Sequence, residues 1–451
     1  MMRCLGLLGI CLGLGLLACQ ATKPLSPLEG ELTQALRQDL WERWFPTCVD
    51  TLHGGYFTNL AADWQVSPGP QPKVLVTQAR HLWSASQAAN VFPEDPRYAA
   101  AAAHGYTFLR EQMWDPVYGG FYQRVDPSAT SASIDQQLLK YSYGNAFAIY
   151  GLAAYYGQSK SPGALYLAQE TFRWLDRHAY DEEHGGYFPF LSREGKVVQA
   201  LLGDSAATHP PYLAYKDQNP TIHLLEAFTE LYQYWPDSLL RVRLEEQLHL
   251  VRDVITQSEG YMGLYFTQDW QRISYRDSAQ EIREAHYQLD HVSFGHDVET
   301  AYLILEACEV LGGNCESTLR KGKAMLDHSL FWGGFDWEKG GFFEQGYYHP
   351  GQDIYQIIDR RKNWWAQAEG LHTLLLYQQH FPEEQRYADA FDLQWTYIQT
   401  YLLDPKYGGW YSWGVDESPE AKAEPKGHAW KGSYHTGRAL MRCRDLLREA
   451  S

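Results

Sequence analysis

Histidines stand close to charged residues at the beginnings of three helical segments. Each pair has a spacing of three residues: His223 and Glu226 in "HLLEA", His296 and Glu299 in "GHDVE", and His435 and Arg438 in "YHTGR". Residues three apart lie on one face of a helix. An imidazole exchanges protons near pH 7, so these residues could perform acid–base chemistry.

Equivalent positions in neighbouring helical segments carry further polar and aromatic residues. They are Arg80, Tyr141, Asn145, Asn219, Trp365, Glu369 and Tyr434, with Asn219, Asn363 and Ser433 as candidate helix caps. A helix that begins with polar residues and continues as a buried apolar segment suits a first turn that faces a wet cavity. If the helices point the same ends at one mouth, these side chains converge on a single pocket.

A repeat explains how separate helices could share one mouth. Glycine pairs followed by aromatic residues recur about every 70 residues, and a fixed period indicates a repeat architecture. The segments are 53–57, 118–122, 184–188, a degenerate 261–266, 340–344 and 407–411. Each predicts a tight turn leading into a short strand, with helical periodicity between the turns. We expect six units of two helices, an all-α (α/α)6 barrel with short β-hairpins in its loops, forming one domain over residues 30–451.

Composition excludes some function classes. The chain has 451 residues and a net charge of −17, without a basic run, which argues against nucleic acid binding and an electrostatic membrane anchor. Aromatic residues make up 15% of the chain, which suits either sugar stacking or a large core.

The first residues predict export. One arginine and a short apolar run indicate a signal peptide over 1–18. The run ends in "LLAC", which resembles a bacterial lipobox, so we expect Cys19 to be lipidated and 19–29 to form a tether. We expect anchoring at the outer membrane of a Gram-negative bacterium, facing the periplasm, and a monomer or weak dimer.

Three of the seven cysteines, Cys4, Cys11 and Cys19, lie in this first segment. The other four are Cys48, Cys308, Cys315 and Cys443, and they contain no CxxC pair that would indicate zinc. A Cys308–Cys315 disulfide is conceivable in an exported protein. The simpler expectation, which we prefer, is that all four are buried thiols.

Three chemistries fit a pocket with histidines and carboxylates. Zinc binding is disfavoured because there is no HExxH motif and each histidine lies in a different repeat, so we expect no metal. Glycoside hydrolysis would use two carboxylates, from the set Glu226, Glu299 and Glu369. Each of these lies one turn behind a histidine or tryptophan, which suits a supporting role better.

Proton transfer at carbon is the third chemistry. Two histidines on opposite faces of an opened sugar could remove and return a proton next to the aldehyde, while an arginine stabilises the enediolate. This reaction inverts a stereocentre without a cofactor. A glycan-binding lipoprotein would keep the aromatic residues but would not need both His296 and His435.

The motifs resemble those of the N-acylglucosamine 2-epimerase superfamily, most closely its cellobiose and mannobiose 2-epimerases. The similarity extends over residues 30–448 and is carried by segments 223–227, 294–299, 364–369 and 434–438. It implies an (α/α)6 barrel, in agreement with the repeat count. It also implies exchange of glucose and mannose configuration at C2 of the reducing-end sugar of a β-1,4 disaccharide, with an aldose–ketose isomerase or an N-acylglucosamine 2-epimerase as alternatives.

The resemblance also implies residue roles. His296 and His435 would be the acid–base pair, His223 would assist at O1, and Arg80 would bind the enediolate oxygen. Glu299 would orient His296, and Glu226 would do the same for His223. Substrate contacts or support of the pocket would come from Tyr143, Asn219, Trp365, Glu369, Trp430 and Arg438.

One segment departs from the family pattern. Residues 201–220 are expected to contact the second sugar, and their match to the family is poor, so Asp204 and Lys216 are weak candidates. This departure affects the substrate preference more than the chemistry.

Overall fold

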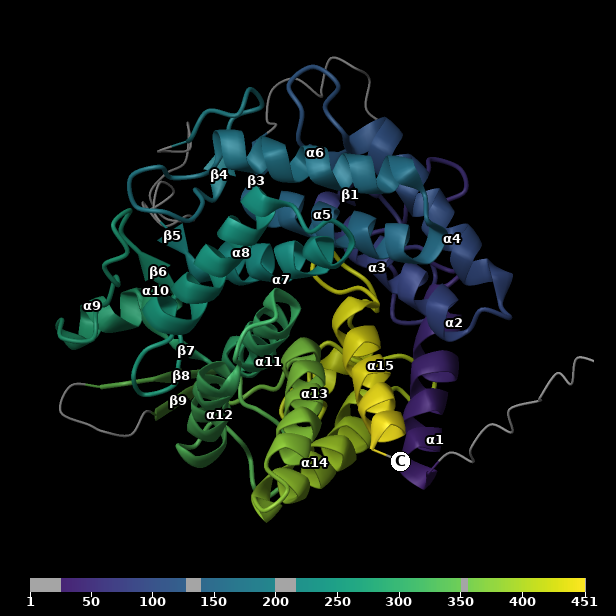
Figure 1. The fold of residues 1–451 in the computed structure, drawn as a ribbon. Helices are drawn as coiled ribbons and strands as arrows, with labels where there is room; N and C mark the ends of the chain where they lie inside the picture. The colour runs from purple at the N-terminus through teal and green to yellow at the C-terminus, as the bar shows by residue number, and fades with distance from the viewer. Residues whose placement is uncertain (1–25, 127–138, 199–215, 350–355, 451) are drawn as a thin grey trace, which may run out of the picture.

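Six helices form a closed inner ring in the computed structural model, which describes residues 26–126, 139–198, 216–349 and 356–450 (Figure 1). They are α3 (Leu75–Val91), α5 (Ser142–Ser159), α7 (Gln218–Tyr234), α11 (Phe294–Leu311), α13 (Trp364–His380) and α15 (Tyr434–Glu449). Each packs against the next, and α15 packs against α3, so the ring closes.

Six further helices surround the ring, and each packs mainly on one inner helix. They are α1 (Pro27–Gln34), α4 (Pro96–Phe108), α6 (Pro162–His178), α8 (Ser238–His249), α12 (Glu316–Phe331) and α14 (Gln385–Tyr397). Helix α1 packs on α15, so the first and last described helices lie side by side (Figure 1). The predicted all-α (α/α)6 barrel is therefore confirmed.

Short helical segments complete the outer layer and the loops. Four π-helical turns extend outer helices, namely η1 (Ala35–Trp41), η2 (Leu109–Met113), η4 (Leu250–Ile255) and η5 (Ile398–Leu402). The remaining segments are α2 (Glu42–Trp44), α9 (Gln280–Ala285), α10 (Tyr287–Asp290) and the 3₁₀ turn η6 (Pro419–Ala423).

Burial explains the different sequence patterns of the two layers. In the inner helix α5, every residue from Gly144 to Tyr155 is buried, because other helices and loops cover all of its sides. A helix that is apolar all round belongs in a core, whereas a surface helix carries one apolar stripe. The outer helix α6 shows such a stripe, with Leu167, Phe172 and Leu175 buried.

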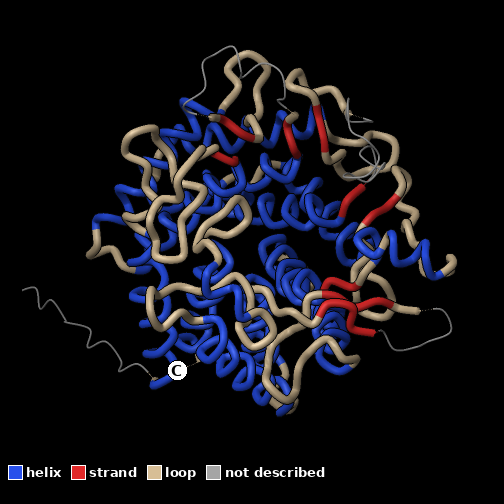
Figure 2. The backbone as a smooth tube through the Cα atoms, turned by 180° about the vertical axis from the view of Figure 1, so that it is seen from behind, coloured by secondary structure: helices blue, strands red, loops and turns tan. Residues whose placement is uncertain are grey.

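Short strands set the starting points of four inner helices. Directly before these helices lie β1 (Lys73–Val74), β3 (Lys140–Tyr141), β5 (Lys216–Asp217) and β7 (Val292–Ser293). Each pairs antiparallel with a strand that follows the next glycine turn, namely β2 (Arg124–Val125), β4 (Phe190–Leu191), β6 (Tyr265–Phe266) or β8 (Gln345–Tyr347), and β9 (Gln356–Asp359) extends the last pair. Strands and long loops gather on one face of the barrel (Figure 2).

The glycine turns have the predicted conformation. Gly54 and Gly55 have φ values of +82° and +65°, which glycine adopts without a steric penalty. The aspartate before the turn accepts backbone N–H groups and a buried lysine ammonium. This ion pair recurs in five units: Asp50–Lys73, Asp115–Lys140, Asp181–Lys216, Asp336–Lys362 and Asp404–Lys426, with N–O distances of 2.6, 3.0, 2.8, 2.8 and 2.6 Å.

Lys216 is therefore a structural residue. Its ammonium is fully buried and donates to Asp181 and to the carbonyl of Gly185, so the expectation that it contacts a second sugar is wrong. Asp204, its companion in that expectation, lies outside the described residues.

The fourth unit differs from the others. Val292 stands where other units have the lysine, and Asp297 accepts the N–H of Met262 at 2.9 Å. In the first and fifth units the same contact is made by a glutamine amide: Gln78 with Tyr56, and Gln367 with Phe342. The unit that carries the "GHDVE" motif has thus replaced an amide with a carboxyl group.

A disulfide joins Cys308, near the end of α11, to Cys315, just before α12. The preference for buried thiols is wrong for this pair, because the turn after α11 brings the two residues to a Cα–Cα distance of 5.8 Å. It is confirmed for Cys48 and Cys443, which are buried and unpaired.

The predicted signal peptide and Cys19 lie outside the described residues. Within the described part of the chain, every helix is too short or too polar to cross a membrane.

Candidate active site

A cavity of about 180 Å³ opens among the starts of the inner helices. Nine predicted site residues line it: Arg80, Tyr143, Asn219, His223, His296, Glu299, Trp365, Trp430 and His435. Trp364 is the tenth lining residue. The three other predicted residues, Glu226, Glu369 and Arg438, lie in a buried network that contacts the histidines.

The barrel brings these side chains together because each comes from the beginning of a different inner helix. His223, His296 and His435 lie in the first two turns of α7, α11 and α15. Their positions on the helix axis are similar, so closing the ring places them around one mouth. Most of the polar helix beginnings noted in the sequence therefore line the pocket, but Tyr141 and Asn145 do not, because Tyr141 pairs in β3 and the Asn145 amide bonds backbone groups of Phe121 and Tyr141.

The expected helix caps are confirmed in part. The side chain of Asn363 accepts the N–H of Ala366 and caps α13. Helix α7 is capped by Asp217 rather than Asn219, which leaves the Asn219 side chain to face the cavity. Ser433 precedes α15, and its hydroxyl lies 3.1 Å from Nδ1 of His81.

His223 is supported by Glu226, as the sequence predicted. Its Nδ1 lies 2.8 Å from Oε2 of Glu226, and both side chains are buried. Burial opposes ionisation of Glu226, but Arg438 and the hydrogen bond from His223 outweigh it and lower its pKa to about 2. Glu226 is thus a firm carboxylate behind the histidine.

His435 is supported by Glu369. Its Nδ1 lies 2.6 Å from Oε1 of Glu369, whose other oxygen accepts the Tyr302 hydroxyl at 2.8 Å. Burial raises the pKa of Glu369. Burial and the nearby Arg80 lower the pKa of His435 well below its usual value, so the imidazole is neutral at pH 7.

His296 has a different kind of partner. Its Nδ1 lies 2.8 Å from the hydroxyl of Ser293. The expectation that Glu299 orients His296 is wrong, because the Glu299 carboxylate turns toward α15 and accepts Nη2 of Arg438 at 2.5 Å. Burial, then repulsion from His223, lowers the pKa of His296 to about 3, so it is also neutral at pH 7.

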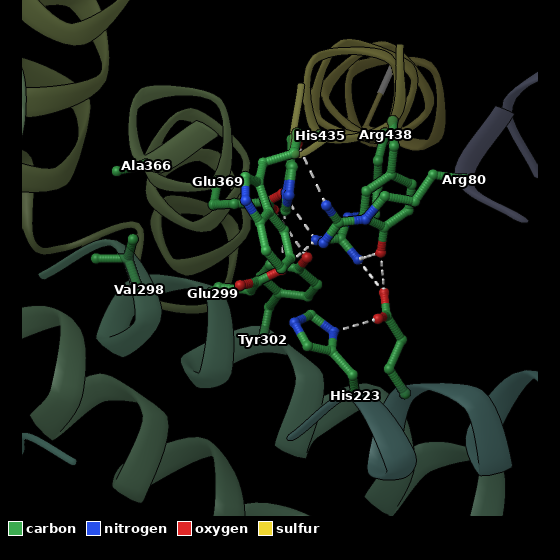
Figure 3. A network of polar contacts seen from close by, with 12 residues as sticks. Arg80, His223, Val298, Glu299, Tyr302, Ala366, Glu369, His435 and Arg438 are labelled. Atoms are coloured by element: carbon green, nitrogen blue, oxygen red, sulfur yellow. Dashed lines mark hydrogen bonds and ion pairs between the residues drawn. The ribbon is translucent and has the colours of Figure 1, made fainter. Parts of the chain in front are cut away.

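Arg438 connects the carboxylates of three helices (Figure 3). Its guanidinium donates to Glu226, to Glu299 and, at 2.7 Å, to Glu369. Three carboxylates face one arginine, and burial raises the pKa of Glu299, with repulsion from Glu369 adding to the rise. The shared arginine therefore ties the three helices together, and the crowding of carboxylates favours a proton on Glu299.

Oxygen and nitrogen atoms of Glu299, Glu369 and His435 lie within 4.8 Å of one another, close enough to ligate a metal ion. The Arg438 guanidinium already supplies a cation at this place, since its Nη2 donates to both carboxylates. This arrangement suits an internal ion pair better than a metal site, because an arginine cannot release its proton to make room for one.

Arg80 supplies a fixed positive charge at the cavity. Its Nη2 donates to the Tyr143 hydroxyl at 3.0 Å, and its guanidinium lies over the Phe147 ring at 4.3 Å. A positioned cation in a largely desolvated pocket stabilises a developing oxyanion. The site can therefore support an enediolate as well as proton transfer.

Aromatic rings form the walls. The Trp365 ring lies 4.7 Å from the ring of His296 and 5.7 Å from that of His435. Trp430 is 56% exposed at the rim, where a flat apolar face can stack on a sugar ring.

Sequence reasoning missed Ser293, Trp364 and Tyr302 as parts of the site. Trp364 could have been predicted from the sequence, because it is adjacent to Trp365. Tyr302 lies two turns into α11, and only the ring closure places it against Glu369 on α13.

Comparison with known proteins gives a consistent result. The profile of the family described as "N-acylglucosamine 2-epimerase (GlcNAc 2-epimerase)" matches residues 55–439. A cellobiose 2-epimerase of Bacteroides fragilis is 27% identical, covering 94% of this chain and 99% of its own. A D-mannose isomerase of Marinomonas mediterranea is 26% identical over 90% of this chain and 93% of its own. The solved structure of a cellobiose 2-epimerase from Spirochaeta thermophila superposes with a TM-score of 0.76 at 29% identity, covering 94% of this chain and 97% of its own.

Proposed function

Because the chain belongs to the N-acylglucosamine 2-epimerase family, we propose that it is a sugar 2-epimerase. It interconverts the glucose and mannose configurations at C2 of the reducing-end residue of a β-1,4 disaccharide such as cellobiose or mannobiose. The relatives named cellobiose 2-epimerase, similar over nearly their whole length, support this substrate class.

The observation that carries the proposal is the placement of His296 and His435. They come from different helices, line the same cavity, and their rings lie 4.7 and 5.7 Å from the Trp365 ring. Two imidazoles in such an arrangement can reach opposite faces of one carbon. Inversion at C2 needs proton removal on one face and proton delivery on the other.

The proposed reaction begins with opening of the sugar ring, which makes the C2 proton acidic because an aldehyde is then its neighbour. One histidine takes the C2 proton, and the electron pair moves onto O1 to form a cis-enediolate. Arg80 stabilises that oxygen. The other histidine, which is neutral in the sugar-free protein, first takes up a proton from solvent and then returns it, as an imidazolium, to the opposite face of C2.

His223 and the buried carboxylates support this cycle. His223 lines the cavity, is held by Glu226, and can move a proton at O1 during ring opening. Glu369 stabilises the imidazolium of His435 when it forms, as an adjacent carboxylate does. The step needs no oxidant or reductant, because only protons move.

Product analysis of the purified protein after incubation with cellobiose, and separately with mannobiose, tests the proposal. We expect the C2 epimer of each disaccharide, in an equilibrium reached from either side. Release of monosaccharides would identify a glycoside hydrolase instead. Binding without conversion would identify a glycan-binding protein.

An aldose–ketose isomerase is the second candidate function, favoured by the D-mannose isomerase among the relatives. It would form the same enediolate but return the proton to C1. Incubation with mannose distinguishes the two, because a ketose product would support the isomerase. Incubation with N-acetylglucosamine and N-acetylmannosamine tests the N-acylglucosamine 2-epimerase alternative.

We also propose that the protein is exported and anchored by a lipid on Cys19. The "LLAC" sequence supports this, as does the Cys308–Cys315 disulfide, because disulfides persist in oxidising compartments. Mass spectrometry of the N-terminal peptide and detergent partition of the wild type against Cys19→Ser test the anchor. Size-exclusion chromatography of the soluble domain tests the expected monomer or weak dimer.

A further inference from the structure

Ser293 lies at a rigid point of the barrel, directly before α11. It belongs to β7, which pairs with β8 in the three-stranded sheet, and its partner in the ladder is Gln345. The residue is 8% exposed, and its hydroxyl lies 2.8 Å from Nδ1 of His296. Both the backbone and the side chain of Ser293 are therefore fixed relative to the imidazole.

The hydroxyl is not used as a helix cap. A serine before a helix usually accepts an N–H from the first turn of that helix. Among the described residues, no such bond from α11 reaches the Ser293 side chain. The hydrogen bond that the structure gives to this hydroxyl is the one with His296.

His296 differs from the other two pocket histidines in this respect. His223 and His435 each place Nδ1 against a carboxylate, at 2.8 and 2.6 Å. A carboxylate stabilises an imidazolium, whereas a hydroxyl, which can donate to Nδ1 or accept its proton, adds no charge. His296 is thus the pocket histidine whose partner does not favour protonation.

We propose that Ser293 is a positioning residue that holds neutral His296 in the tautomer with its proton on Nδ1. In this tautomer Nε2 keeps a free electron pair toward the cavity and can take the C2 proton of the sugar. The opposite tautomer would carry its proton on Nε2 and could not act as a base there. This role deepens the proposed epimerase function and rests on it.

The proton balance is simple. Neutral His296 takes the C2 proton on Nε2 and becomes an imidazolium, while Nδ1–H continues to donate to Ser293. When His296 returns a proton to an enediolate, Nε2 loses it and the same Nδ1–H tautomer is restored. Ser293 therefore accepts one hydrogen bond throughout and never exchanges its own proton.

The charged or titratable groups around His296 are mainly histidines and an arginine. The groups that act on it from neighbouring elements are His223 on α7, His291 before β7, His435 on α15 and Arg80 on α3. Glu299 lines the same cavity but bonds Arg438. A carboxylate at position 293 would therefore be a new kind of partner for His296.

Three variants separate this role from a structural one. Ser293→Ala removes the acceptor, and we expect kcat for cellobiose to fall about 10- to 100-fold, the usual cost of losing the outer partner of a functional imidazole, with KM nearly unchanged. Ser293→Thr keeps the hydroxyl and should restore most of the activity. Ser293→Asp supplies a carboxylate and should move the acidic limb of the pH–rate profile upward by about one pH unit or more.

Ser433→Ala is the matched control. Ser433 also directly precedes an inner helix and also places its hydroxyl near a histidine Nδ1, at 3.1 Å, but that histidine, His81, is outside the cavity lining. We expect this variant to lose some stability while the acidic limb of its pH–rate profile stays at the wild-type position.

Nitrogen-15 NMR of the histidines in the sugar-free protein reads the tautomer directly, with His296→Gln assigning the signal. The proposal expects the Nδ1–H tautomer of His296 in the wild type and a mixture in Ser293→Ala. An Nε2–H tautomer in the wild type would overturn it, as would a His296 tautomer and a pH profile that stay the same as in the wild type in both Ser293→Ala and Ser293→Asp. Because the NMR needs no substrate, a failure of the proposed epimerase activity would be seen separately, as absence of turnover in the wild type.

Discussion

Nδ1 of His435 lies 2.6 Å from Oε1 of Glu369, and that same oxygen accepts Nη2 of Arg438 at 2.7 Å. One carboxylate atom on α13 thus holds both a pocket histidine and the central arginine of the buried network. Rotation of the imidazole would break its bond to the oxygen that also holds Arg438. This shared atom links the chemistry of the pocket to the packing of the barrel (Figure 3).

Glu369→Gln keeps the shape of the side chain but removes the charge that faces His435. We expect kcat to fall by about 10- to 100-fold, because the imidazolium of His435 loses its stabilising partner. Steady-state kinetics with cellobiose measures the effect. Glu29→Gln is the control, since Glu29 is also buried and paired with an arginine, Arg448, but lies on outer helix α1. Equal losses in both variants would contradict the account.

Arg438→Met leaves three buried carboxylates without their cation. We expect a loss of about 3 to 5 kcal/mol in the free energy of unfolding, the usual cost of an unpaired buried charge. Urea denaturation measures it, and the loss should be smaller at pH 5 than at pH 8 because protonation neutralises the carboxylates.

Arg442→Met is the comparison for that variant. Arg442 lies one turn after Arg438 on α15, is partly exposed and pairs with Glu306 of α11 at 3.2 Å, so its removal should cost less than about 1 kcal/mol. If Arg438→Met were as mild as Arg442→Met, the buried network would not contribute to stability as described.

Asp297→Asn should stabilise the protein at neutral pH. Burial raises the pKa of Asp297 well above its ordinary value, and its Oδ2 has no hydrogen-bond partner among the described residues. The folded state therefore binds a proton more tightly than the unfolded state, so wild-type stability falls as pH rises from about 4 through the folded pKa. An asparagine avoids this loss and restores the amide contact that Gln78 and Gln367 make in other units.

Asp336→Asn should instead destabilise the protein at neutral pH. Burial raises the pKa of Asp336, but the Lys362 ammonium at 2.8 Å outweighs burial and holds this pKa below its usual value. The carboxylate therefore contributes stability at neutral pH, and this stability is lost on acidification. Urea unfolding at pH 5 and pH 8 should show Asp297→Asn above the wild type, by more at pH 8, and Asp336→Asn below it. A destabilised Asp297→Asn would show that the carboxyl is ionised and specifically needed.

The Cys308–Cys315 disulfide should matter for stability and not for catalysis. Replacing both cysteines with serine should cost about 2 to 3 kcal/mol, the entropy of closing a short loop in the unfolded chain. The bond lies near the end of α11, whereas His296 lies in the first turn, so kcat should be unchanged. Thermal unfolding with and without reductant measures the first effect, and a large fall in kcat would contradict the second.

The fold was predictable because its information is local and repeated. Each glycine turn and each helical segment is visible in the sequence, and the repeat supplies the closure. The polar beginnings of the inner helices likewise predicted most residues that reach the cavity, but not that Asn145 would bond backbone groups instead. His223 with Glu226 was predictable as a pair because both partners lie on one helix.

Contacts between helices were harder to predict. Glu299 follows His296 by three residues, yet its carboxylate bonds Arg438 on α15, because the neighbouring helix offers a buried cation. Helical spacing shows which face a residue occupies but not what lies opposite. Lys216 was misassigned for a similar reason, since its partner Asp181 is 35 residues away. Cys308 and Cys315 meet only because of the turn between their helices.

The most direct test of the central claim is proton NMR of the reducing-end H2 of cellobiose in deuterated water, with wild type, His296→Asn and His435→Asn. The account predicts that the wild type exchanges H2 for deuterium while the C2 epimer accumulates. Each single variant should lose epimer formation, because one face of C2 then lacks its proton carrier. Epimer formation by the wild type without loss of the H2 signal, or full epimerisation by either variant, would contradict a mechanism in which two histidines invert C2.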